Sequence, residues 1–229
     1  YSYMAYGPDF AKKLNGIYAL AIWDSREKRL VLCRDRLGVK PLFYTIKNGT
    51  LVFGSEQKAL FCYPEVFPEA DEDSFREIFG IGPARSPGTG VFKGVREVLP
   101  GRLAIFSENG FEEHSYWSLE ARRHTDNYSE TVDKVSFLLR DAVKRQMVSD
   151  VPVCTFLSGG VDSSVVTAIA SDFLREQGKT LNTFSFDFTH NDEFFKANSF
   201  QPTRDRPYVD KVLKEYPLRH TYLECDEAT

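Results

Sequence analysis

Residues 158–164, SGGVDSS, are the stretch whose residue types and spacing could do chemistry. They follow a mostly apolar run, 153–157, and lead into a helical pattern that begins at Val161. Gly159 and Gly160 would let a ligand approach the backbone closely. The N–H groups of the first helical turn, together with the helix dipole, favour an anion, and the serine hydroxyls add donors. The sequence therefore predicts a loop that holds phosphate groups.

Asp162 distinguishes this loop from the Walker-type phosphate loop, in which a Lys follows the glycines. A carboxylate beside phosphates would repel them unless Mg²⁺ lay between, so we predict that Asp162 is a metal ligand. This suits a reaction in which the two outer phosphates of ATP leave together as pyrophosphate. The alternative is purely structural, because Gly-Gly makes any tight turn, and Asp or Ser is common in a first helical turn.

Strands and helices alternate after residue 129, which predicts an α/β domain with a doubly wound parallel sheet. Apolar residues from Val132 to Met147 recur at three- and four-residue steps, the pattern of an amphipathic helix, and Ser129 is its predicted N-cap. The other expected elements are strands at 153–157, 181–188 and 220–225, and helices at 161–177 and 207–216.

The first 117 residues have the pattern of an antiparallel, β-rich α+β domain. Asn48-Gly49 is the expected two-residue hairpin turn, since both residues tolerate positive φ. The expected strands are 16–23, 29–34, 42–46, 51–55 and a pair within 97–117, with short helices near 56–61 and 71–79. The polar segment 118–128 has no clear period and is the predicted linker between domains 1–117 and 129–229.

The composition is that of an ordinary globular protein, with 229 residues, 42% hydrophobic and 27% charged. A net charge of −4 argues against a general nucleic-acid or membrane-surface binder. No apolar run is long enough to span a membrane, and no signal peptide is expected. The four cysteines are far apart and have no His at ligand spacing, which favours free thiols in a reducing cytoplasm over a disulfide framework or zinc.

Two separate motifs carry a resemblance to known families. SGGVDSS resembles the pyrophosphate loop of the ATP pyrophosphatase (PP-loop) superfamily, and with the preceding SDVPVCTFL it is similar to the synthetase domain of glutamine-dependent asparagine synthetases. The first half resembles the class II glutamine amidotransferase domains, which are Ntn hydrolases. It carries RDRLGVKPL at 34–42 and FGSEQKAL at 53–60, in that family's order and spacing. Taken alone, RDRLGVKPL could simply turn one strand into the next, with solvated charges.

The resemblance implies asparagine synthase activity that uses ATP and Mg²⁺. The aspartate β-carboxylate would attack the α-phosphorus of ATP, giving β-aspartyl-AMP and pyrophosphate. Ammonia freed from glutamine would then pass through an internal channel and displace AMP. The implied ATP and pyrophosphate site comprises Leu157, Ser158, Gly159, Gly160, Val161, Asp162, Ser163, Ser164 and Phe186. Ile17 falls in the implied channel wall, whereas Lys40 lies where an apolar residue would suit that wall better.

Other parts of the family pattern match no residue of the sequence. These are the nucleophilic Cys of the glutaminase, the Arg, Asn-Gly pair and Asp that bind glutamine, and a second acidic phosphate loop. We therefore assign no catalytic residue, and we expect these 229 residues alone to be an inactive, internal part of a longer enzyme.

Several alternatives remain open. The protein could be a β-lactam synthetase-like or other carboxylate-adenylating amidotransferase on the same scaffold, a different PP-loop enzyme, or a non-catalytic nucleotide-binding module. The expected partners are the small molecules aspartate, glutamine or ammonia, and ATP, without nucleic acid or membrane. A homodimer is an open alternative to a monomer.

Overall fold

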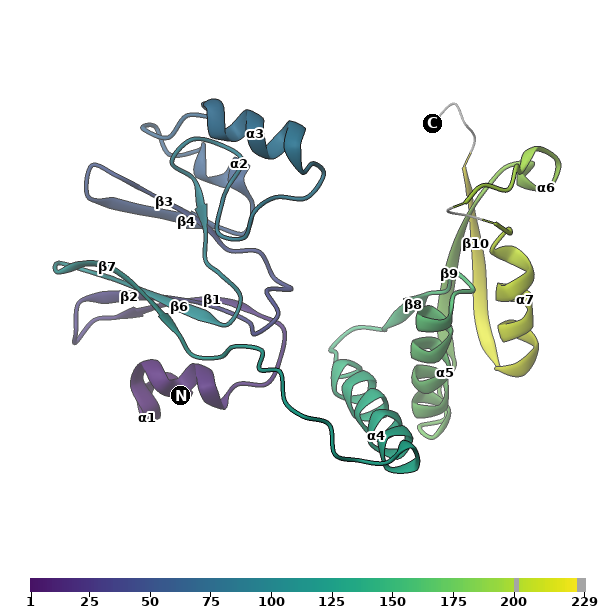
Figure 1. Ribbon diagram of the computed structural model, residues 1–229. Coiled ribbons are helices and arrows are strands. Elements are labelled where there is room, and N and C mark those ends of the chain that lie inside the picture. The colour runs from purple at the N-terminus through teal and green to yellow at the C-terminus, as the bar shows by residue number, and fades with distance from the viewer. Residues whose placement is uncertain (200–201, 226–229) are drawn as a thin grey trace. The chain divides into compact units, whose positions relative to one another are not determined.

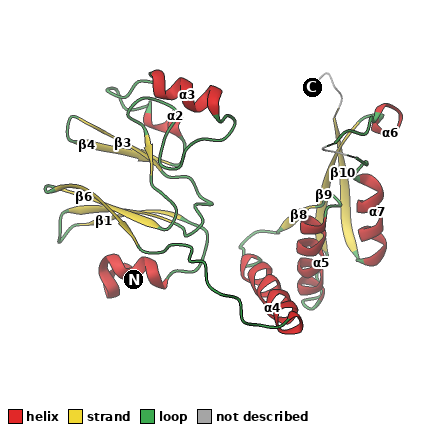
Figure 2. Ribbon diagram, viewed as in Figure 1, coloured by secondary structure: helices red, strands yellow, loops and turns green. Residues whose placement is uncertain are grey.

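The computed structural model describes residues 1–199 and 202–225 (Figure 1). The chain divides into two compact units, Tyr1–Arg122 and Arg123–Thr229. Among the described residues, no sheet contains strands from both units. The first unit is rich in antiparallel strands, and the second alternates strands with helices (Figure 2).

The first unit contains two sheets. The four-stranded antiparallel sheet has the order β1-β2-β6-β7, and the three-stranded sheet has the order β4-β3-β5. The strands are β1 (Ala19–Asp24), β2 (Arg29–Arg34), β3 (Phe43–Lys47), β4 (Thr50–Gly54), β5 (Arg96–Glu97), β6 (Arg102–Ser107) and β7 (Gly110–Ser115). The helices are α1 (Ser2–Tyr6), the 3₁₀ helix η1 (Gly7–Lys13), α2 (Gln57–Leu60) and α3 (Glu72–Gly80).

Alternation along β2 builds the core of this unit. Val31 and Cys33 pack with Phe10 of η1 on one side of the sheet. Leu32 points to the other side, where it packs with Tyr44 of the second sheet. Both sides of β2 are therefore buried, as expected for a central strand between a helix and a second sheet.

The RDRLGVKPL segment after β2 is held by two buried charges. The Asp35 carboxylate accepts hydrogen bonds from the backbone N–H groups of residues 18, 37, 39 and 40. Arg34 donates to the carbonyls of Gly38 and Val98 and forms a 2.8 Å ion pair with Glu97. Arg34 is 6% exposed and Asp35 is 2% exposed, so the alternative of solvated charges does not hold for these two residues. The reason is that the backbone groups of a tight turn need partners, and these side chains provide them.

The second unit is built on a parallel sheet with the order β10-β9-β8. Its elements are α4 (Tyr128–Gln146), β8 (Cys154–Phe156), α5 (Val161–Arg175), β9 (Leu181–Phe188), α6 (Asn191–Phe194), α7 (Arg206–Glu215) and β10 (Leu218–Cys225). The strand order advances in one direction across the described residues. The reversal that makes a sheet doubly wound is therefore not seen within them, and that finer assignment stays a prediction.

Helix α4 begins at Tyr128, and its N-cap is Asn127, so the prediction of Ser129 as the cap is wrong. The Asn127 side chain accepts a hydrogen bond from the Glu130 N–H, and the Glu130 carboxylate accepts one from the Asn127 N–H. This reciprocal capping box needs a side chain that can accept a hydrogen bond, commonly Glu or Gln, three positions after the cap. Counting from Ser129, that position holds Val132, which cannot complete the box.

Candidate nucleotide-binding site

The phosphate-loop candidate, residues 158–164, connects the end of β8 to the start of α5. Leu157, fully buried just before it, donates its N–H to the Phe184 carbonyl at 2.8 Å. The Ser185 hydroxyl donates to the Leu157 carbonyl. These two bonds to β9 fix the position at which the chain leaves the sheet, so the loop starts from a rigid support.

The two glycines of the loop have different roles. Gly159 has a φ of +77°, and a Cβ there would lie 2.8 Å from Tyr208 Cβ and 2.9 Å from the Asp205 carbonyl oxygen. Gly160 has a φ of −70°, and its Cβ would meet only Ser158 Oγ, at 3.5 Å. Gly159 is therefore required by its close packing on the start of α7, whereas the space beside Gly160 is open.

The serines of the loop form a small hydrogen-bonded group. Ser158 Oγ lies 3.0 Å from Ser163 Oγ, which donates to the Gly160 carbonyl at 3.2 Å. The Ser164 N–H makes the first helical bond, to the same carbonyl, at 3.0 Å. No described side chain caps this end of α5. The N–H groups of its first turn can therefore serve an anion.

Asp162 lies exposed in the first turn of α5. Among the described residues, no three His, Cys, Asp or Glu side chains gather where they could hold a metal ion. A single carboxylate nevertheless fits Mg²⁺, which keeps several waters and takes its other ligands from substrate phosphates. The donor set at Asp162 is thus compatible with a metal ion that arrives with a nucleotide.

A pocket of about 300 Å³ lies at the carboxyl ends of β8 and β9. Of the nine residues predicted for the ATP site, Leu157, Ser158 and Phe186 line it, and the other six form the adjoining loop. Phe186 is 56% exposed and meets Phe188 edge-to-face, with 5.1 Å between ring centroids. An exposed aromatic ring in a pocket can stack on a planar ligand. Its exposure also argues against a core role for this ring.

The sequence prediction missed several polar residues that line this pocket. Asp187, Asn191, Arg206 and Tyr222 line it together with Ser158. They come from β9, α6, α7 and β10, and the polar insertion between β9 and α7 hides their proximity in the sequence. One of them could have been found from the sequence: Asp187 is an acidic residue near the carboxyl end of the strand that follows the glycine loop, a position that often contacts a nucleotide.

Each half of the chain matches a known protein family. Residues 1–117 match the family described as glutamine amidotransferase domain, and residues 134–229 match the family described as asparagine synthase. The chain belongs to the family that joins these two domains.

Similar sequences occur in bacteria, archaea and fungi. The chain is 46% identical to "Asparagine synthetase [glutamine-hydrolyzing] 3" of Bacillus subtilis, over 96% of this chain and 36% of the relative. It is 34% identical to "Putative asparagine synthetase [glutamine-hydrolyzing] 2" of Methanocaldococcus jannaschii, over 98% of this chain and 42% of the relative. "Amidase chyE" of Penicillium rubens is 35% identical, over 79% of this chain and 27% of the relative. The chain thus spans well under half the length of these relatives.

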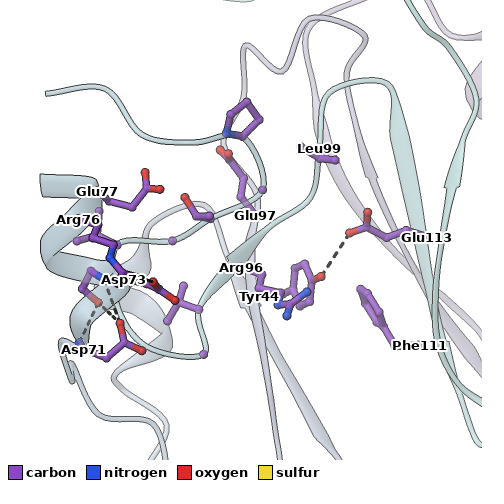
Figure 3. Close-up of a pocket in the computed structure, with 18 residues that line it drawn as sticks. Tyr44, Asp71, Asp73, Arg76, Glu77, Arg96, Glu97, Leu99, Phe111 and Glu113 are labelled. Carbon is purple, nitrogen blue, oxygen red and sulfur yellow. Dashed lines mark hydrogen bonds and ion pairs between the residues drawn. The ribbon is translucent and has the colours of Figure 1, made fainter. Parts of the chain in front are cut away.

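The half that matches the glutamine amidotransferase domain holds a larger hollow of about 800 Å³ beside α3 and β5 (Figure 3). Several of its charged groups are already engaged: the Glu77 carboxylate accepts the Ser86 N–H, and Arg76 pairs with Asp73. On the side away from α3, Tyr44 donates to Glu113 at 3.3 Å. None of the predicted site residues lines it, and Ile17, the predicted channel residue, lies elsewhere in this unit and is 44% exposed.

Two further predictions concerned the cysteines and membrane-spanning segments. The four cysteines are free. In the described part of the chain, no helix combines the length and the apolar character that crossing a membrane would require.

Proposed function

We propose that these residues are part of a glutamine-hydrolysing asparagine synthase. Such an enzyme adenylates the aspartate β-carboxylate with ATP, releasing pyrophosphate, and then replaces AMP with ammonia derived from glutamine. The observation that carries the proposal is the 158–164 loop, which presents uncapped N–H groups and serine hydroxyls at the start of α5, inside the half that matches the asparagine synthase family.

In this proposal the loop binds the nucleotide through groups of this chain alone. The first-turn N–H groups of α5 and the hydroxyls of Ser158, Ser163 and Ser164 hold the β- and γ-phosphates. Leu157 and Phe186 contact the adenine. Asp162 holds Mg²⁺, which when bound would neutralise charge on the leaving pyrophosphate. Fixing the phosphates in one orientation prepares the α-phosphorus for attack, so positioning is the main contribution of this site.

The finer fold assignments belong to the same proposal. We assign 1–117 to an Ntn-hydrolase-like glutamine amidotransferase domain, 118–128 to a linker, and 129–229 to a PP-loop ATP pyrophosphatase domain. The alternating elements around the parallel sheet support the second assignment, and the two antiparallel sheets are compatible with the first. Ile17 is the proposed residue of the ammonia channel.

Aspartate is the proposed acceptor, and a different carboxylate is the second candidate. The relative named "Amidase chyE" matches this chain at 35% identity, so proteins with this shared sequence are named for more than one activity. The substrates glutamine or ammonia and ATP are common to both candidates.

Product analysis of the full-length protein tests the proposal. The protein is incubated with MgATP, aspartate and glutamine, and asparagine, AMP and pyrophosphate are measured while each substrate is omitted in turn. We expect asparagine and pyrophosphate in equal amounts, with both absent when aspartate or ATP is left out. Pyrophosphate that appears only with a different carboxylate would replace aspartate as the acceptor, and no pyrophosphate with any carboxylate would refute the adenylation chemistry.

A further inference from the structure

We propose that Asp187 binds the ribose hydroxyls of the nucleotide, and so makes the site selective for a ribonucleotide. The inference rests on the proposed nucleotide site and adds a residue to it. Asp187 is the next-to-last residue of β9, the strand that follows the 158–164 loop and helix α5. In βαβ nucleotide sites, an acidic residue at the end of this second strand is well placed to accept hydrogen bonds from ribose hydroxyls, because the phosphates occupy the preceding loop.

Asp187 shares the 300 Å³ pocket with both ends of the proposed nucleotide site. Ser158 of the phosphate loop and Phe186, the proposed adenine contact, line the same pocket. A ribose lies between the base and the phosphates of a nucleotide. A carboxylate that shares a pocket with contacts for both ends is therefore suited to meet the sugar.

Among the described residues, the hydrogen bonds of Asp187 leave one carboxylate oxygen for a ligand. Oδ1 accepts from the Phe188 N–H at 2.9 Å and from the Asn191 side-chain amide at 2.6 Å. Oδ2 lies 3.8 Å from Arg206 Nη1, an ion-pair distance rather than a hydrogen bond. Oδ1 thus orients the carboxylate, while Oδ2 retains capacity to accept hydroxyl protons.

Arg206 offsets the charge that this carboxylate would bring close to a polyphosphate. Its guanidinium lies 4.1 Å from the ring centroid of Tyr222 and also pairs with Glu224 at 3.1 Å. The Tyr222 hydroxyl donates to Asp210 at 2.8 Å, which holds the ring in place beneath the guanidinium. The positive charge is therefore fixed beside Asp187.

The test is a cycle that combines protein variants with sugar analogues. Binding of ATP, 2′-deoxy-ATP, 3′-deoxy-ATP and pyrophosphate to the full-length protein is measured by calorimetry in the presence of Mg²⁺. The variants are Asp187→Ala and Asp187→Asn, which keeps the shape of the side chain if the alanine variant fails to fold. The matched control is Glu224→Ala, which also removes a carboxylate partner of Arg206 but does not line the pocket.

We expect the unmodified protein to bind at least one deoxy analogue about 10- to 100-fold more weakly than ATP, the range for hydrogen bonds to a charged group. Both Asp187 variants should reduce this preference, the alanine variant to within about twofold, and Glu224→Ala should keep it. Pyrophosphate should still bind to every variant, because it contains no sugar. Loss of a negative partner of Arg206 changes the affinity for ATP and for its deoxy analogues alike, so the preference is read as the ratio of these affinities within each variant.

A sugar preference that survives in a variant that still binds pyrophosphate would overturn the role of Asp187 and leave the proposed function standing. Equal affinity of the unmodified protein for ATP and both analogues would do the same. If the unmodified protein bound neither ATP nor pyrophosphate, the proposed function itself would fail, and this inference with it.

Discussion

Replacing Gly159 with Ala should destabilise the second unit, because this position is constrained twice. Its φ of +77° is a conformation that costs an L-residue about 1–2 kcal/mol. The added methyl group would also lie 2.9 Å from the Asp205 carbonyl oxygen and 3.1 Å from the Val209 nitrogen. Both are backbone atoms at the start of α7 and cannot simply rotate away, so overpacking adds about 1–3 kcal/mol. The expected loss in the free energy of unfolding is about 2–5 kcal/mol.

Gly160→Ala is the matched control. This residue has ordinary φ, and the new methyl group would contact only Ser158 Oγ, at 3.5 Å. We expect its unfolding free energy to stay within about 1 kcal/mol of the unmodified protein, since such a contact is an ordinary van der Waals distance. The pair of variants therefore separates the steric requirement at one glycine from any general sensitivity of the loop.

Urea unfolding of the 229-residue chain, followed by two signals, gives the measurement. Both tryptophans, Trp23 and Trp117, belong to the first unit, so their fluorescence reports on that unit, while far-ultraviolet circular dichroism also reports the helices of the second. In Gly159→Ala, the second unit should unfold at a lower urea concentration, which lowers the midpoint seen by circular dichroism. The midpoint seen by tryptophan fluorescence should stay where it is in the unmodified chain. Equal stability of the two variants, or a larger loss for Gly160→Ala, would refute the assignment of Gly159 as a packing glycine.

Three further predictions concern the first unit. Burial alone would raise the pKa of Asp35, but backbone N–H groups, those of Lys40 and Val39 foremost, outweigh it and lower that pKa from 3.8. A carboxyl group whose pKa is lower in the folded than in the unfolded state stabilises the fold at pH values above its unfolded-state pKa. The unmodified protein should therefore exceed Asp35→Asn in unfolding free energy by a constant amount above about pH 5, and this difference should shrink as the pH falls further. A difference that stays constant down to about pH 2 would contradict this. Arg34→Met leaves the buried Glu97 with Arg85 as its one cationic partner among the described residues, and it also leaves the Gly38 and Val98 carbonyls without their Arg34 donors. Urea titrations should show a loss of about 3–5 kcal/mol in the unfolding free energy from these effects together, and a loss below about 1 kcal/mol would contradict a structural role for Arg34. Burial raises the pKa of Cys33 to about 12, so a thiol reagent at neutral pH should modify this residue only after unfolding; labelling of Cys33 in the native protein, located by peptide mass, would contradict its burial.

Turn residues and apolar repeats in the sequence predicted much of the secondary structure, because turns and helices depend on residues close together along the chain. The Asn48-Gly49 turn joins β3 to β4 with both residues at positive φ, as its residue types require. The helical period after residue 130 and the strand that precedes the glycine loop are likewise present as α4 and β8. One-sided apolar repeats and glycine turns determine such features within a few residues.

Features that depend on distant contacts could not be predicted in this way. Burial of Arg34 depends on Glu97 and on the Val98 carbonyl, more than sixty positions along the chain. Asp187 and Arg206 meet at the pocket only because the chain returns there at the start of α7, nineteen positions after Asp187. The N-cap at Asn127 was within reach of the sequence, since Glu130 completes its capping box, but the apolar period alone does not mark that boundary.

The most direct test of the central claim, that residues 158–164 hold the phosphates of ATP with Mg²⁺ on Asp162, is pyrophosphate release by the full-length protein and its Asp162→Ala variant. Both are assayed with MgATP, aspartate and glutamine, and glutamate formation in the same samples reports glutamine hydrolysis. We predict that the variant loses pyrophosphate release by about 100-fold or more, as expected for removal of a group that stabilises charge in the transition state, while glutamate formation largely survives. Pyrophosphate release at most of the unmodified rate would contradict the account.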